Sequence, residues 1–85
     1  METSPHLKAT IMEVVDNQIN GNDPPETRQT YERLQAGGYS KDEAKRLIGA
    51  VLVEEMYDMT QEKRAFDRPR FVAALHRLPN LPEEE

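Results

Sequence analysis

The chain has 85 residues, of which 36% are hydrophobic and 32% are charged, and its formal net charge at pH 7 is −5. This length is enough for one domain with a modest core. The sequence contains no cysteine, which excludes disulfides, thiolate metal sites and cysteine chemistry. It shows no signal-peptide pattern and no apolar run near the ~20 residues of a membrane span. We therefore expect a soluble, cytoplasmic protein that does not enter a membrane.

Two helices are expected in the first 38 residues. Ser4-Pro5 is a typical helix start, and apolar residues with helical spacing follow it until Asn20-Gly21-Asn22 ends the helix. A mostly polar second helix is expected to begin at Asp23-Pro24, with Asp23 as its cap and Glu26 as the capping-box partner. The glycine pair 37–38 ends it. Because this helix is polar, we expect it to be peripheral.

The third helix is expected to be the centre of the fold. Ser40 and Glu43 form a capping box, and the helix is predicted to extend to about Thr60. Its main apolar stripe consists of Ala44, Leu47, Ile48, Val51, Leu52 and Met59. A second stripe, on another side, consists of Ala50, Val53 and Tyr57. A helix that is apolar on two sides is central in its own fold or shared with a partner chain, so we expect a homodimer formed through this helix.

A fourth helix is expected after Phe66, with Asp67 as its cap and Pro79 as its end. Its buried face is predicted to contain Phe71, Val72, Leu75 and Leu78. Residues 1–79 are thus expected to form a single all-α, four-helix, bundle-like domain. Its first and fourth helices would pack against the central third. Residues 80–85 are predicted to be a disordered acidic tail.

Glu55 is the most unusual polar residue, because it falls in the middle of the main apolar stripe of the third helix. A charge in such a place costs several kcal/mol unless it is paired or hydrogen-bonded. Gln18 occupies a similar position in the first helix. The favoured interpretation is a contact of Glu55 with Gln18 or with an arginine, which fixes how two helices dock. The alternative is a ligand-binding or catalytic carboxylate.

Two E-x-x-D pairs, Glu13 with Asp16 and Glu55 with Asp58, form a candidate acidic cluster. A spacing of three places both carboxylates of a pair on one helix face. Opposing pairs on facing helices could hold Mg²⁺, as in all-helical nucleotide pyrophosphohydrolases, but the glutamate-rich first pair of those enzymes is missing. We therefore expect no catalytic residue, metal or cofactor. The leading hypothesis is a non-enzymatic interaction or structural module, and the alternative is a metal-dependent hydrolase or a degenerate relative of one.

The other polar candidates have simpler interpretations. His6 and His76 lack a second ligand at helical spacing and are expected to be surface or capping groups. The segment 63–77 is locally basic, with Lys63, Arg64, Arg68, Arg70 and Arg77. We favour a solvated face that pairs with acids elsewhere over a weak nucleic-acid site, because the net charge is negative.

The order of motifs resembles a family of small bacterial all-helical proteins of unknown function. The matching segments are Glu13–Ile19, Asn22–Glu26, Gly38–Gly49 and Val53–Tyr57, and Phe66-Asp67 followed by Phe71 and Leu75, so that the resemblance covers roughly residues 6–78. The resemblance implies a helical fold and a histidine-rich, metal-binding face on the first helix and at the start of the third. This chain has Lys8, Met12, Asp42 and Arg46 where those histidines are expected, and only Asp16 and Glu43 remain as possible ligands. The resemblance thus implies that this member has lost any metal site of the family.

Overall fold

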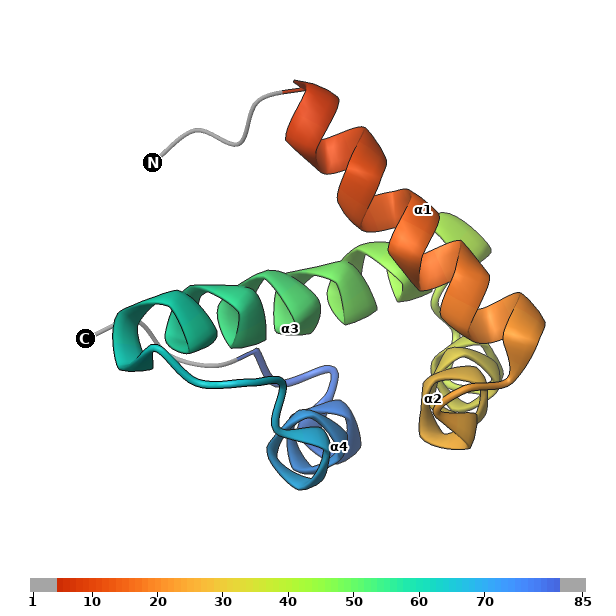
Figure 1. The fold of residues 1–85 in the computed structure, drawn as a ribbon. Helices are drawn as coiled ribbons and strands as arrows, with labels where there is room; N and C mark the ends of the chain where they lie inside the picture. Colours follow the sequence, from red (N-terminus) through yellow and green to blue (C-terminus); the bar gives the residue numbers. More distant parts are fainter. Residues whose placement is uncertain (1–4, 82–85) are drawn as a thin grey trace.

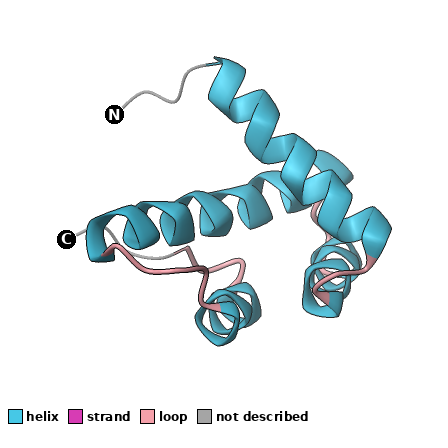
Figure 2. Cartoon of the chain, viewed as in Figure 1, coloured by secondary structure: helices cyan, strands magenta, loops and turns pink. Residues whose placement is uncertain are grey.

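The structure, a computed structural model, describes residues 5–81. In this range the chain forms four helices and no strand (Figures 1 and 2). The helices are α1 (Pro5–Gly21), α2 (Pro25–Ala36), α3 (Lys41–Glu62) and α4 (Arg68–Arg77). The all-α, four-helix prediction is therefore confirmed. The predicted cap Ser4 and residues 82–85 of the predicted tail lie outside the described residues.

The predicted starts of α3 and α4 are confirmed by their hydrogen bonds. The Ser40 hydroxyl accepts from the Glu43 backbone N–H at 3.0 Å, and the Glu43 carboxylate accepts from the Ser40 N–H at 2.9 Å, which completes a capping box. The Asp67 carboxylate accepts from the Arg70 N–H at 3.1 Å. The rings of Phe66 and Phe71 lie on either side of this cap, with their centroids 5.3 Å apart.

The prediction that Asp23 caps α2 is wrong. The capping position is occupied by Pro24, and no side chain makes a capping hydrogen bond there, so Glu26 does not complete a capping box either. A residue that precedes a proline is disfavoured in the helical conformation, so Pro24 stays extended and the helix begins at Pro25, one residue later than expected. The Asp23 carboxylate instead lies 3.8 Å from the guanidinium of Arg68.

The core consists of side chains from all four helices. Its buried members are Ile11, Val15, Ile19, Leu34, Ala44, Ile48, Val51, Leu52, Phe71, Leu75 and Leu78. Most of the main stripe of α3 belongs to this core, as predicted, whereas the second stripe of α3 is exposed. A Cβ atom at Gly49 would lie 3.4 Å from the Ile11 side chain, so the glycine lets α1 approach α3 closely. In Figure 1, α1 diverges from α3 on either side of this crossing.

The expectation that α2 is peripheral is also wrong. In the described part of the chain α2 contacts each of the other three helices, whereas α1 and α4 do not contact each other. Arg28 of α2 donates to the Ile19 carbonyl at the end of α1, at 3.0 Å. Arg33 donates to the carbonyls of Leu75 and Leu78 at the end of α4, at 3.0 and 2.8 Å. Polar side chains of α2 thus donate hydrogen bonds to carbonyl groups at the ends of two neighbouring helices.

Candidate functional site

Glu55 is buried, with 4% of its surface exposed, and it is fully paired. Its carboxylate accepts from Nη1 and Nη2 of Arg64 at 2.7 and 3.2 Å, and from the backbone N–H of Asp67 at 3.0 Å. The Arg64 hydrogen bonds lower the pKa of Glu55, although burial acts in the opposite direction. The predicted contact with an arginine is therefore confirmed. Gln18 has a different partner, because its side-chain oxygen accepts from the Thr27 hydroxyl at 2.9 Å.

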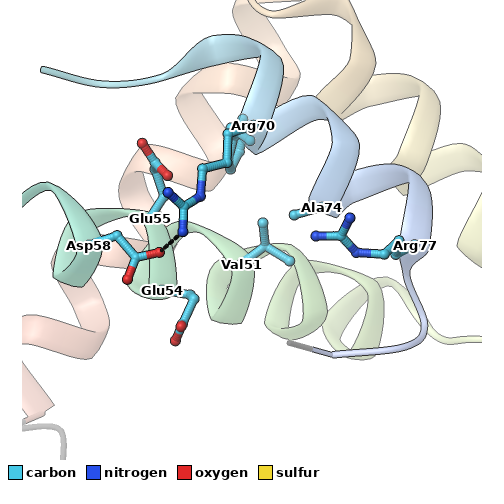
Figure 3. Close-up of a pocket in the computed structure, with 8 residues that line it drawn as sticks. Val51, Glu54, Glu55, Asp58, Arg70, Ala74 and Arg77 are labelled. Carbon is cyan, nitrogen blue, oxygen red and sulfur yellow. Dashed lines mark hydrogen bonds and ion pairs between the residues drawn. The ribbon is translucent and has the colours of Figure 1, made fainter. Parts of the chain in front are cut away.

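A cleft of about 230 Å³ lies between α3 and α4, and Glu55 is among the residues that line it (Figure 3). It is lined by Val51, Glu54, Glu55, Asp58, Arg70, Phe71, Ala74 and Arg77. Carboxylates from α3 form one side and guanidinium groups from α4 the other, and Arg70 Nη2 lies 2.8 Å from Asp58 Oδ2. Within residues 5–81, neither Glu54 nor Arg77 belongs to an ion pair. The cleft is lined by both apolar and charged side chains, and three of its five charged residues, Glu55, Asp58 and Arg70, are paired within the chain.

The four acids of the candidate cluster do not form a common site. Asp16 of α1 lies 2.8 Å from the Lys45 ammonium, and Glu13 is exposed on the same helix. Glu55 and Asp58 have the arginine partners described above. Over the described range, no group of three or more histidine, aspartate or glutamate side chains is placed to hold a metal ion. The carboxylates that were candidates for Mg²⁺ are instead used mainly in ion pairs.

The basic segment also pairs with acids of the same chain. Arg64 and Arg70 contact acids of α3, and Arg68 lies 3.8 and 3.7 Å from the carboxylates of Asp23 and Glu26. This agrees with the interpretation as a solvated, internally paired face. Apart from the Arg64–Glu55 pair, whose carboxylate is buried, these ion pairs are exposed and contribute little to stability. All of them reduce the positive charge offered to a nucleic-acid phosphate.

The histidine positions separate into two groups. His6 lies at the start of α1 and His76 near the end of α4, and both side chains are exposed. Three positions at which the family resemblance predicts histidine, Lys8, Met12 and Arg46, line one groove between α1 and α3. A thioether and two cations replace imidazole there, which makes these side chains unsuited to a divalent metal.

This groove between α1 and α3 has a volume of about 230 Å³ and a largely apolar lining of Lys8, Ile11, Met12, Arg46, Gly49, Ala50 and Val53. It adjoins the exposed second stripe of α3. We call Arg46, Ala50, Val53, Tyr57 and Thr60 the α3 seam, because all five are exposed along one line of the helix. Val53 and Tyr57 are 38% and 55% exposed. The sequence predicted the second stripe but not the groove, which depends on the angle between α1 and α3.

No protein-family model, curated protein or solved structure matches this chain. The resemblance to a family of small bacterial proteins therefore stays a prediction. No helix within residues 5–81 is long and apolar enough to cross a membrane. The fold and its surfaces define a small all-α domain with a paired charge network on one side of α3 and, on another, an exposed seam whose middle residues Ala50, Val53 and Tyr57 are apolar.

Proposed function

We propose that this protein is a non-enzymatic interaction module that associates with a second copy of itself through the α3 seam. One observation carries the proposal: α3 supplies the core of its own domain with one face and leaves the apolar side chains of Val53, Met56 and Tyr57 exposed on another. Val53, Met56 and Tyr57 are all more than one third exposed. An apolar face of this kind favours association with a partner.

The charge network supports a structural rather than a catalytic role for the buried acid. A general acid or base needs a proton-transfer group with a pKa near the working pH, and Glu55 has its pKa moved the other way by Arg64. Its three hydrogen bonds join α3 to the segment that precedes α4. The hydrolase and nucleic-acid alternatives have no comparable support, because most of the acids and arginines that they require are paired within the chain.

The dimer is expected to be weak. The seam from Arg46 to Thr60 spans 15 residues, or roughly 21 Å along the helix. A single pair of helices of this length buries less than the ~1,200 Å² of a stable protein interface. We therefore expect a dissociation constant in about the micromolar range, so that association depends strongly on concentration.

Sedimentation velocity over a series of protein concentrations tests the proposal. The natural chain should change from monomer to dimer as concentration rises. Val53→Glu should remain monomeric, because it places a charge in the middle of the seam. The matched control is Leu81→Glu, which introduces the same charge at another exposed apolar position, 48% exposed and outside the seam, and should dimerise normally. A natural chain that stays monomeric throughout would contradict self-association. Equal behaviour of the two variants would contradict the α3 seam as the surface through which it occurs.

A further inference from the structure

We infer that the second copy lies antiparallel along the α3 seam, so that Arg46 of each copy covers the Tyr57 ring of the other. This inference rests on the proposed function and specifies its geometry. It concerns the orientation of the two helices, the residues in register and the side chain that enters the groove between α1 and α3.

The spacing of the seam is that of a two-helix coiled coil. Its five residues are separated by steps of four, three, four and three, which is the alternation of a and d positions in a heptad, and the middle three, Ala50, Val53 and Tyr57, are apolar as those positions require. The same helix buries Ile48, Val51 and Leu52 in the core of its own domain, on its other side. The seam is therefore a separate, continuous line that a second helix of the same kind can follow.

The charges and sizes along the seam favour the antiparallel orientation. A parallel pair in register would place Arg46 against its own copy, with like charges opposed, and Tyr57 against its own copy. An antiparallel pair centred between Ala50 and Val53 places Ala50 opposite Val53 and Arg46 opposite Tyr57. The small Ala50 allows the helices to approach closely at the centre. Each guanidinium then meets an aromatic face, which is a favourable cation–π arrangement.

Arg46 is available for this contact. It is exposed, and among the described residues it takes part in no ion pair. Tyr57 is 55% exposed. Both ends of the proposed contact thus lie on the surface, on one line of α3 and three turns apart.

In the same register, a side chain of the second copy can fill the groove between α1 and α3. Met56 is 42% exposed and follows Gly49, which lies against α1, by seven residues or about two helical turns, so it lies on the same side of α3 next to the seam. In the antiparallel pair it lies close to Gly49 of the second copy, which lines the groove. Gly49 contributes no side chain to that lining, and a methionine side chain is flexible enough to fill an irregular apolar space. We therefore assign the groove to Met56 of the second copy.

Disulfide cross-linking tests the orientation, because the natural chain has no cysteine. Glu43→Cys and Thr60→Cys are made as separate chains, mixed and mildly oxidised. Glu43 continues the seam three residues before Arg46, and in the proposed register it faces Thr60 of the second copy. Two copies of position 43 would then be separated by 17 residues along the helix axis, roughly 25 Å, which is far beyond disulfide reach.

The expected product is a disulfide between positions 43 and 60, with little 43–43 or 60–60 product. Predominant 43–43 and 60–60 disulfides would overturn the antiparallel orientation. Dimers that sediment normally but form no disulfide would overturn the register and leave the proposed function standing. Absence of dimers of the natural chain in sedimentation would instead be a failure of the proposed function itself.

A double-mutant cycle tests the contact between Arg46 and Tyr57. Arg46→Ala and Tyr57→Leu should each weaken dimerisation, and because the dimer contains the contact twice, roughly 5- to 30-fold is expected for each. The double variant should be little weaker than either single variant. Tyr57→Phe keeps the ring and should dimerise nearly normally, and Arg77→Ala controls for loss of an arginine outside the seam. Effects that multiply fully in the double variant would overturn the contact.

Discussion

The carboxylate of Glu55 and the guanidinium of Arg64 form an ion pair with an Nη1–Oε2 distance of 2.7 Å, although the two residues are nine positions apart and a helix end lies between them. The chain changes direction at Lys63, which ends α3 in the left-handed conformation with a φ of 53°. The same carboxylate accepts from the N–H of Asp67, the cap of α4. Glu55 therefore fixes both the return of the chain and the start of the next helix.

Glu55→Gln should destabilise the fold. The substitution keeps the shape of the side chain but removes its charge. Arg64 then lacks its buried counter-ion, and the acceptor for three donor groups is weakened. Loss of a charged hydrogen-bonded partner in a buried site costs about 2–3 kcal/mol. Urea denaturation followed by circular dichroism measures the change in the free energy of unfolding.

The neighbouring residue supplies the control for this experiment. Glu54 is chemically identical, lies one position earlier on α3 and belongs to no ion pair in the described part of the chain. Glu54→Gln should change the unfolding free energy by less than about 0.5 kcal/mol. Equal effects of the two substitutions would show that the Glu55–Arg64 pair contributes nothing specific to stability.

The stability of the protein should fall in acid, and Glu55 should be one cause. Its pKa in the folded protein is below the ordinary value of 4.5 because Arg64 donates hydrogen bonds to it. The native state therefore binds this proton less readily than the unfolded state does. The resulting stabilisation is present above about pH 4.5 and is lost as the pH falls through the lower, folded pKa.

This dependence can be isolated by comparing two chains. Urea midpoints measured between about pH 3 and pH 7 should decline for the natural chain on the acid side. Glu43 and Glu62 also have lowered pKa values, through hydrogen bonds with Ser40 and with Arg64, and act in the same direction. Glu55→Gln should therefore show a shallower decline without abolishing it. An identical decline in both chains would contradict the assignment to Glu55.

The position of Glu55 could be predicted from the sequence, whereas its partner could only be predicted as an arginine. Helical spacing alone places Glu55 inside the apolar stripe, and the physical cost of an unpaired charge then demands a partner. The choice of Arg64 among several arginines depends on the path of residues 63–67. That path is set by the left-handed turn at Lys63 and by the cap of α4, which helical periodicity does not describe.

The polar composition of α2 led to a wrong prediction of where this helix lies in the fold. Composition indicated a peripheral helix, but Thr27 and Thr30 are buried and Arg28 and Arg33 reach the ends of α1 and α4. These contacts join residues whose sequence separation is as large as 45 positions. No local sequence pattern predicts these contacts, because a solvent-exposed arginine and an arginine that binds a distant helix end have the same sequence signature.

Arg33→Gln should lower the free energy of unfolding, because Arg33 stabilises the C-terminal end of α4. The substitution removes the guanidinium that donates to the carbonyls of Leu75 and Leu78 and that complements the negative end of the helix dipole. A loss of about 1 kcal/mol is expected. Thermal melts would measure it, with Glu32→Gln as the control at the adjacent, exposed position. An unchanged melting temperature for Arg33→Gln would show that α4 ends equally well without this contact.

Adjacent residues of α3 should respond differently to the same truncation. Leu52 is 4% exposed and packs in the core, whereas Val53 is 38% exposed on the seam. Leu52→Ala should reduce the unfolding free energy by about 2–5 kcal/mol, because it removes buried methyl groups and leaves a cavity. Val53→Ala, measured in dilute protein so that dimers do not contribute, should cost less than about 0.5 kcal/mol. A small effect at Leu52 would contradict the assignment of the two faces of α3.

The effect of metal ions on the melting temperature distinguishes the proposed interaction module from the hydrolase alternative. A ligand present at 100 times its dissociation constant stabilises a native protein by about 2.7 kcal/mol, which in a domain of this size raises the melting temperature by roughly 10–20 °C. The acids that would hold Mg²⁺ are committed to Lys45, Arg64 and Arg70, and a metal would have to displace those cations. We therefore expect the melting temperature in EDTA to equal that in Mg²⁺, Mn²⁺, Ni²⁺ or Zn²⁺. A shift of the expected size with one metal, lost in Asp16→Asn or Asp58→Asn, would instead favour the hydrolase alternative.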